Sequence, residues 1–288
     1  MPRTIAQGFE RLKQNLEITD LQAGTVSTRQ QNVRAALEDG LTVLDTFLTG
    51  SYRRNTMIAP LGEADVDIVA VLDPSYYKWD GQAAVLDRVR RVLLKRYHST
   101  PRISRNGQAV TITFTDFCVD VVPAFNRQGG GYLIPDSTQN QWIATDPKRH
   151  VEIWAEANKK HGYMLVPLIK MVKAWNKTHS ALLRSFSLEV LTLQIVNNVT
   201  ISDYPSGVRY VMDKARTQIR SPVYDPAGYG GNVASYLDTY QKINEVVNRF
   251  ETAYTRAVDA EELARRGRVE QAFDKWRMIF SDYFPVYS

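Results

Sequence analysis

The 288-residue sequence contains little cysteine and histidine and no long apolar run. Its single cysteine, Cys118, excludes an intrachain disulfide and a cysteine-based zinc module, and its four histidines lack a spacing typical of metal ligands. No apolar stretch approaches the roughly 20 residues that a bilayer-spanning helix needs, and the start, MPRTIAQGFERLKQN, has no apolar core like that of a signal peptide. We therefore expect a soluble, cytoplasmic protein without a membrane segment.

A strong excess of charge is also absent. The sequence has 36 basic and 31 acidic residues, a formal net charge of +5, and no long basic run that would mark a groove for a polymer. A mild positive excess suits a nucleoside triphosphate as well as it suits DNA. The charge therefore permits a polyanionic ligand without indicating nucleic acid.

Two hydrophobic patterns divide the sequence. Up to about residue 146, the strand-like runs ADVDIVAVL and FCVDVVPAF alternate with helical segments, which include two in the first 40 residues and one at about 82–97. From about residue 147 onward the apolar spacing is helical, and the last helical segment extends from about residue 232 to 276. The sequence predicts an α+β (mixed α/β) protein, with a core and N-terminal helices over 1–146 and a helical lobe over 147–288.

A pair of aspartates on a predicted strand points to the chemistry. Asp65 and Asp67 share one face of ADVDIVAVL because side chains alternate along a strand, and Asp120 lies in the second apolar strand. Carboxylates this close repel each other, and hard oxygen ligands favour Mg²⁺ or Mn²⁺ as the compensating cation. Two aspartates one residue apart are common on wet strand faces, but the apolar neighbours here indicate buried strands. The pattern is typical of a two-metal phosphoryl-transfer site.

Gly50 and Ser51 precede the aspartates at the end of another predicted strand. Glycine lets the backbone approach a ligand closely, and the serine hydroxyl can donate a hydrogen bond. Gly-Ser is also an ordinary turn, so only its position upstream of Asp65 favours a contact with triphosphate oxygens.

At this point the sequence resembles a known family. GSYRRNT, DVDI and the later VDVV resemble the signature of the nucleotidyltransferase superfamily that includes polymerase beta and poly(A) polymerase. Four further segments resemble, in order, the bacterial relatives of cyclic GMP-AMP synthase and oligoadenylate synthase, called CD-NTases: YLIPDSTQNQWIATDPKRH, LIKMVKAWNK, SFSLEVLTL and YDPAGYGGNVA. The resemblance extends from about residue 50 to 233. It implies a polymerase-beta-like core, an oligoadenylate-synthase-like helical lobe and an active site in the cleft.

The resemblance also implies roles for individual residues. Two Mg²⁺ ions, with Mn²⁺ as an alternative, would be held by Asp65, Asp67 and Asp120, and Asp120 would help to deprotonate the attacking ribose hydroxyl. The residues that would hold the donor triphosphate are Gly50, Ser51, Lys173 and Ser187. Asp225, together with Asn232, matches a family loop that borders the nucleotide pocket.

Three of these residues have structural alternatives. Lys173 could be solvated on an amphipathic helix, and Ser187 could cap the helix LEVLTLQIV. In the loop of Asp225, Asn232 could cap the final helix. The residue types alone do not choose between these roles and contacts with a nucleotide.

The function that the resemblance implies is template-independent joining of nucleoside triphosphates into a cyclic di- or trinucleotide second messenger for bacterial antiphage (CBASS) defence. The product would act through a separate effector, a separate protein could regulate the enzyme, and the missing zinc ligands argue against stable DNA binding. One alternative is a linear oligonucleotide or poly(A)-type transferase. Another is a catalytically silent nucleotide- or partner-binding module, which the presence of all three aspartates disfavours.

Overall fold

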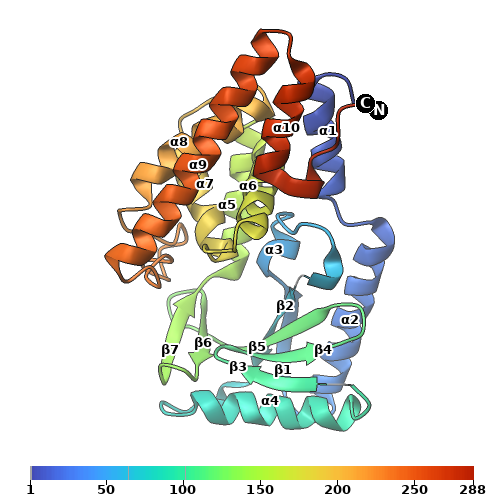
Figure 1. Ribbon diagram of the computed structural model, residues 1–288. Coiled ribbons are helices and arrows are strands. Elements are labelled where there is room, and N and C mark those ends of the chain that lie inside the picture. Colours follow the sequence, from blue (N-terminus) through green and yellow to red (C-terminus); the bar gives the residue numbers. More distant parts are fainter. Residues whose placement is uncertain (1, 64, 101) are drawn as a thin grey trace. The chain divides into compact units, whose positions relative to one another are not determined.

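The chain forms two compact units, seen in a computed structural model that describes residues 2–63, 65–100 and 102–288 (Figure 1). The sheet unit is Ile18–Glu152, and the helical unit combines the residues up to Glu17 with Ile153–Ser288. Ala64, the first residue of the expected strand ADVDIVAVL, lies outside the described residues.

The sheet unit is built on a mixed sheet. Its strand order is β1 (Val43–Leu48), β2 (Asp65–Leu72), β5 (Cys118–Asn126), β4 (Ala109–Thr113) and β3 (Arg102–Asn106). Strands β2 and β5 are parallel, and the other neighbours in this order are antiparallel. A hairpin of β6 (Tyr132–Asp136) and β7 (Gln141–Thr145) continues from the end of β5.

The two faces of the sheet have different neighbours because side chains alternate along each strand. One face carries Val66 and Ile68 and packs in a core with the apolar faces of α2 (Asp20–Glu38) and α4 (Gln82–Arg96). The opposite face has a smaller apolar cluster around Val69 and Val71. Asp65 and Asp67 precede these two valines at the same alternation, so they belong to this second face.

Short elements complete the sheet unit. A one-turn helix, α3 (Gly50–Arg53), follows β1, where the sequence predicts a turn. Two 3₁₀ turns lie before and after β2, at Leu61–Glu63 and Pro74–Tyr76.

The helical unit contains α1 (Ile5–Asn15), the C-terminal part of α5 (Pro147–Lys160), α6 (Leu165–Thr178), α7 (Ser185–Val196), α8 (Tyr204–Gln218), α9 (Tyr240–Arg265) and α10 (Val269–Phe280). A 3₁₀ turn at Ser281–Tyr283 follows α10, and the two chain ends lie side by side in this unit (Figure 1). Among the described helices, none has both the length and the apolar character needed to cross a bilayer.

The N-terminal helix differs from expectation in its partners. The sequence prediction grouped it with the sheet, whereas in the structure α1 contacts α6, α8 and α10. Phe9 of α1 is 1% exposed and meets the rings of Trp276, Phe280 and Phe284 edge-on, at centroid distances of 4.8, 6.1 and 5.2 Å. Burial of this aromatic cluster explains why α1 joins the helical unit.

The predicted helical segment over residues 232–276 is wrong in its extent. Helix α9 begins only at Tyr240, after Thr239 accepts a capping hydrogen bond from the Lys242 amide, and Gly267 separates α9 from α10 with a left-handed φ of +77°. Asn232 caps no helix, because its Oδ1 accepts hydrogen bonds from the amides of Val223 and Ala234. Asn232 therefore closes a loop.

Candidate active site

The three predicted carboxylates lie on two neighbouring strands of one sheet. The parallel register pairs Asp67 with Asp120 and Asp65 with Cys118. Paired positions on adjacent strands are about 4.8 Å apart, and residues i and i+2 of a strand are about 6.6 Å apart on the same face. Asp65 is exposed, whereas Asp67 and Asp120 are half-buried. The fold thus brings all three aspartates to one end of the β2–β5 pair.

Asp120 has an unusual electrostatic environment. Burial raises the pKa of its carboxyl above the ordinary 3.8, a hydrogen bond from Thr111 opposes this shift, and the nearby negative charge of Asp65 adds to it. The Thr111 hydroxyl donates to Asp120 Oδ1 at 2.5 Å. A carboxylate with partial burial and a like-charged neighbour favours either a proton or a cation.

The donor set suits a hard divalent cation. Among residues 2–63, 65–100 and 102–288, no three or more His, Cys, Asp or Glu side chains converge closely enough to hold a metal ion. The backbone register of Asp65, Asp67 and Asp120 nevertheless aligns three oxygen donors, and carboxylates are the ligands that Mg²⁺ and Mn²⁺ prefer. The charges of these three carboxylates repel one another, and a bound divalent cation would offset that repulsion. The residues therefore fit Mg²⁺ in chemistry and in strand position.

Gly50 packs directly against the Asp67 carboxylate. Its φ is +64°, and a Cβ placed on it would lie 1.7 Å from Asp67 Oδ2, closer than any side chain can approach. The amide of Thr49 also donates to the Asp67 carbonyl at 2.9 Å. The Ser51 carbonyl accepts from the amides of Thr56 and Met57, at 2.9 and 3.1 Å. These contacts hold the Gly50-Ser51 turn beside the carboxylates.

Lys173 and Ser187 lie in the helical unit and have partners there. Lys173 is not solvated on α6, as the structural alternative assumed, but is 8% exposed and donates to Glu189 Oε1 at 3.1 Å. Ser187 does not cap α7, because this helix begins at Ser185, and its hydroxyl donates to the Val233 carbonyl at 2.6 Å. Neither structural alternative is therefore correct. Glu189 is fully buried, and its ion pair with Lys173 explains the burial of the lysine.

Asp225 organises the loop DPAGYGGN. Its Oδ1 accepts from the amide of Ala227 at 3.0 Å and its Oδ2 accepts from the amide of Gly230 at 2.8 Å. A bridge between Tyr224 and Asn232 closes the base of the loop. Both carboxylate oxygens of Asp225 thus bond to the backbone that they shape.

Thr111 and Asn106 are not among the site residues that the sequence predicts. Asn106 Nδ2 donates to Thr111 Oγ1 at 2.7 Å, and Thr111 in turn donates to Asp120. The alternation in QAVTITFT places Thr111 and Thr113 on one strand face. This signal identifies Thr111 as a site residue only after β4 is known to pair with β5.

Comparison with known proteins identifies the family. The Second Messenger Oligonucleotide or Dinucleotide Synthetase (SMODS) domain matches residues 3–158. A cyclic AMP-AMP-AMP synthase of Acinetobacter sp. is 28% identical over 307 residues, which cover 98% of this chain and 86% of that protein. A probable cyclic nucleotide synthase of Bacillus cereus is 27% identical over 273 residues, which cover 82% of this chain and 81% of that protein.

Solved structures show the same fold. Escherichia coli MS115-1 CdnC in a complex with HORMA-deltaN gives a TM-score of 0.77 at 14% identity, and CdnC with ATP gives 0.75 at 16%. Each comparison covers 97% of this chain and 98% of CdnC. The predicted α+β nucleotidyltransferase fold is confirmed. Because the SMODS match spans more than half of the sequence, the chain belongs to the second messenger oligonucleotide or dinucleotide synthetase family, the CD-NTases, and is a nucleotidyltransferase.

Proposed function

We propose that this cyclic oligonucleotide synthase joins nucleoside triphosphates into a cyclic di- or trinucleotide by two-metal catalysis. The supporting observation is the parallel β2–β5 pairing, which sets Asp67 opposite Asp120 with Asp65 two residues earlier. A structural role alone does not require three aspartates on one end of two adjacent strands, where their charges repel.

The carboxylates are proposed to hold two Mg²⁺ ions, or Mn²⁺ ions in their place. When bound, these ions offset the charge that develops on the phosphate oxygens during attack by the ribose hydroxyl. Asp120 Oδ1 already accepts the Thr111 hydroxyl, and Oδ2 receives no hydrogen bond from the described part of the chain. Oδ2 is therefore the oxygen that we assign to the metal site. Asp120 is also proposed to help deprotonate the attacking ribose hydroxyl, as the resemblance implies.

The Gly50-Ser51 turn is proposed to hold the donor triphosphate. Gly50 has no side chain, so the backbone can approach both the Asp67 carboxylate and a phosphate. The Ser51 hydroxyl can donate to a phosphate oxygen, as the resemblance implies.

The contacts of Lys173 and Ser187 limit how they would act. The ammonium group of Lys173 has three donors, one of which binds Glu189 Oε1. Ser187 has one hydroxyl proton, already given to the Val233 carbonyl, so a phosphate contact requires that bond to break. We propose Lys173 as a triphosphate contact, Ser187 as a contact only after this exchange, and Asp225 as the residue that shapes the pocket-bordering loop.

The biological role follows from the family by analogy. We propose that the product is a second messenger that activates a separate effector in cytoplasmic antiphage defence. The CdnC complex with HORMA-deltaN favours a separate regulatory protein for this chain as well. ATP is the first substrate to test, because of the name of the Acinetobacter relative and the ATP in the second CdnC structure.

The test is incubation of the purified chain with each labelled nucleoside triphosphate, singly and mixed, with Mg²⁺ or Mn²⁺, followed by phosphatase. We expect pyrophosphate release and a phosphatase-resistant product, both lost in Asp67→Asn. Asp45→Asn is the matched control, because Asp45 lies on the neighbouring strand β1 in an exposed ion pair with Lys148 and should not affect the product.

The other outcomes decide between the alternatives. A product that phosphatase degrades indicates a linear oligonucleotide synthase and contradicts cyclisation. Absence of pyrophosphate in every mixture indicates a catalytically silent module. Equal loss in the Asp67→Asn and Asp45→Asn variants contradicts the assigned site.

A further inference from the structure

A chain of hydrogen bonds crosses three strands and ends on Asp120. Asn106 Nδ2 of β3 donates to Thr111 Oγ1 of β4 at 2.7 Å, and Thr111 Oγ1 donates to Asp120 Oδ1 of β5 at 2.5 Å. The register pairs Thr111 directly with Asp120, so the second bond joins opposite positions on adjacent strands. None of these contacts is within one strand, and each depends on the sheet being assembled.

The direction of these hydrogen bonds determines where the hydroxyl proton of Thr111 points. A hydroxyl group has one proton and can accept two hydrogen bonds. Because the Asn106 amide donates to the Thr111 oxygen, the hydroxyl proton is free to point at Asp120 Oδ1. Thr111 is buried, so no bulk water competes strongly for this proton.

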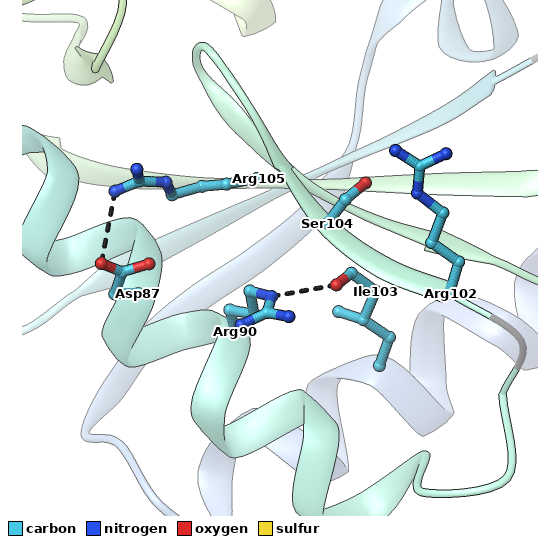
Figure 2. Close-up of a pocket in the computed structure, with 6 residues that line it drawn as sticks. All are labelled: Asp87, Arg90, Arg102, Ile103, Ser104 and Arg105. Carbon is cyan, nitrogen blue, oxygen red and sulfur yellow. Dashed lines mark hydrogen bonds and ion pairs between the residues drawn. The ribbon is translucent and has the colours of Figure 1, made fainter.

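The Asn106 end of this series of hydrogen bonds is anchored. Strand β3 is the edge strand, and α4 holds it through Arg90 Nε, which donates to the Ile103 carbonyl at 2.9 Å, and through Asp87, which pairs with Arg105 at 3.3 Å (Figure 2). The turn after Asn106 is held by Ser137, whose amide and hydroxyl both donate to the Gly107 carbonyl at 2.9 Å. Asn106 therefore donates from a fixed backbone position.

We propose that Thr111 and Asn106 are positioning residues that hold the Asp120 carboxylate in one orientation, with Oδ2 left for the metal site. This inference rests on the proposed role of Asp120 as a metal ligand. Without these hydrogen bonds, the Asp120 carboxylate would be free to rotate away from its neighbour Asp65. A cation would then have to order the carboxylate on binding. Partners that orient a metal ligand in this way typically change metal affinity 10- to 100-fold when removed.

The test measures Mn²⁺ binding in the absence of nucleotide, by electron paramagnetic resonance of the free ion. We expect Thr111→Val to weaken Mn²⁺ binding about tenfold and Thr111→Ser, which keeps the hydroxyl, to restore it to within about threefold of wild type. Thr113→Val is the matched control, since Thr113 lies two residues away on the same strand face and its hydroxyl contacts Cys118.

Asn106→Ala gives an independent measurement. Asn106 is exposed, so this variant should fold, and loss of its amide should free the Thr111 hydroxyl to rotate and weaken Mn²⁺ binding by a smaller factor. In turnover, both Thr111→Val and Asn106→Ala should lower kcat and leave KM for the nucleotide unchanged, because neither side chain is assigned to the triphosphate.

Parallel measurements on Asp120→Ala separate the two proposals. If Asp120→Ala abolishes Mn²⁺ binding while Thr111→Val and Asn106→Ala bind as wild type does, the positioning inference is wrong and the metal site stands. If Asp120→Ala binds Mn²⁺ as wild type does, the proposed metal role is wrong. A loss that Thr113→Val shares equally also overturns the inference, because it would report general loosening of β4.

Discussion

The backbone at Gly50 limits which residues the proposed active site tolerates. Gly50 adopts a left-handed φ of +64° and leaves no room for a Cβ beside Asp67 Oδ2. Any substitution at Gly50 would therefore have two effects. An L-residue in this left-handed conformation costs about 1–2 kcal/mol of strain, and its Cβ would displace the Asp67 carboxylate.

Because Asp67 is a proposed metal ligand, Gly50→Ala should reduce turnover at least about 100-fold, the effect of displacing a group of a catalytic site by about 1 Å. Gly162→Ala is the matched control: Gly162 has a similar φ of +58° and no atom within 4 Å of the position of its Cβ. Steady-state turnover of both variants checks the prediction. Activity of Gly50→Ala equal to that of Gly162→Ala would contradict a role for the contact between Gly50 and Asp67.

Burial of Asp120 predicts a pH-dependent cost in stability. Its raised pKa means that the folded chain binds a proton at a pH where the unfolded chain, with an ordinary value of 3.8, has lost it. Stability therefore falls as pH rises through this window and stays lower above it. In EDTA, Asp120→Asn should raise Tm by a few degrees at about pH 7.5 and by less at about pH 4. Thermal melts at both pH values check this, and an equal increase at both would contradict it.

At the scale of elements, local patterns predict helices and strands well and predict loops poorly. Apolar runs identify β2 and β5, and helical spacing identifies α4, α6 and α7. The start of α9 was misplaced because the loop before it is ordered by the Asp225 carboxylate and by Asn232, whose partners lie up to nine residues away. Hydrophobic spacing contains no information about such bonds.

Asp225→Ala should loosen the loop around it. Two backbone amides, those of Ala227 and Gly230, would lose a charged acceptor, at a cost of about 2 kcal/mol for each bond. Hydrogen–deuterium exchange over residues 224–232 should accelerate, whereas Asp238→Ala, which removes an exposed partner of Lys242, should leave it unchanged. Unaltered exchange in Asp225→Ala would contradict a structural role for this carboxylate.

At the scale of the whole molecule, the chain does not divide in sequence order. Helix α1 belongs to the helical unit although the sheet unit follows it in sequence. The predicted boundary near residue 146 placed α1 with the sheet, because the amphipathic pattern of a helix shows that one face is buried but does not show against which partner.

Phe9→Ala should destabilise the helical unit selectively, by about 3–5 kcal/mol, because it removes a buried ring from the cluster with Trp276 and Phe284. Hydrogen exchange should accelerate in α10 and remain slow in β2. Glu10→Ala, an exposed substitution on the same helix, is the control. Equal acceleration in α10 and β2 would show instead that the two units unfold together.

The sequence by itself determined the local features: the strands, the helices, and the placement of Asp65 and Asp67 on one strand face. These follow from periods of 2 and 3.6 residues, which act between near neighbours. Only the tertiary structure decided that β2 pairs with β5 in a register opposing Asp67 to Asp120, that Lys173 pairs with buried Glu189, and that Thr111 donates to Asp120. Each of these depends on which distant segments pack together, and that choice is made by burial and hydrogen bonding across the assembled fold.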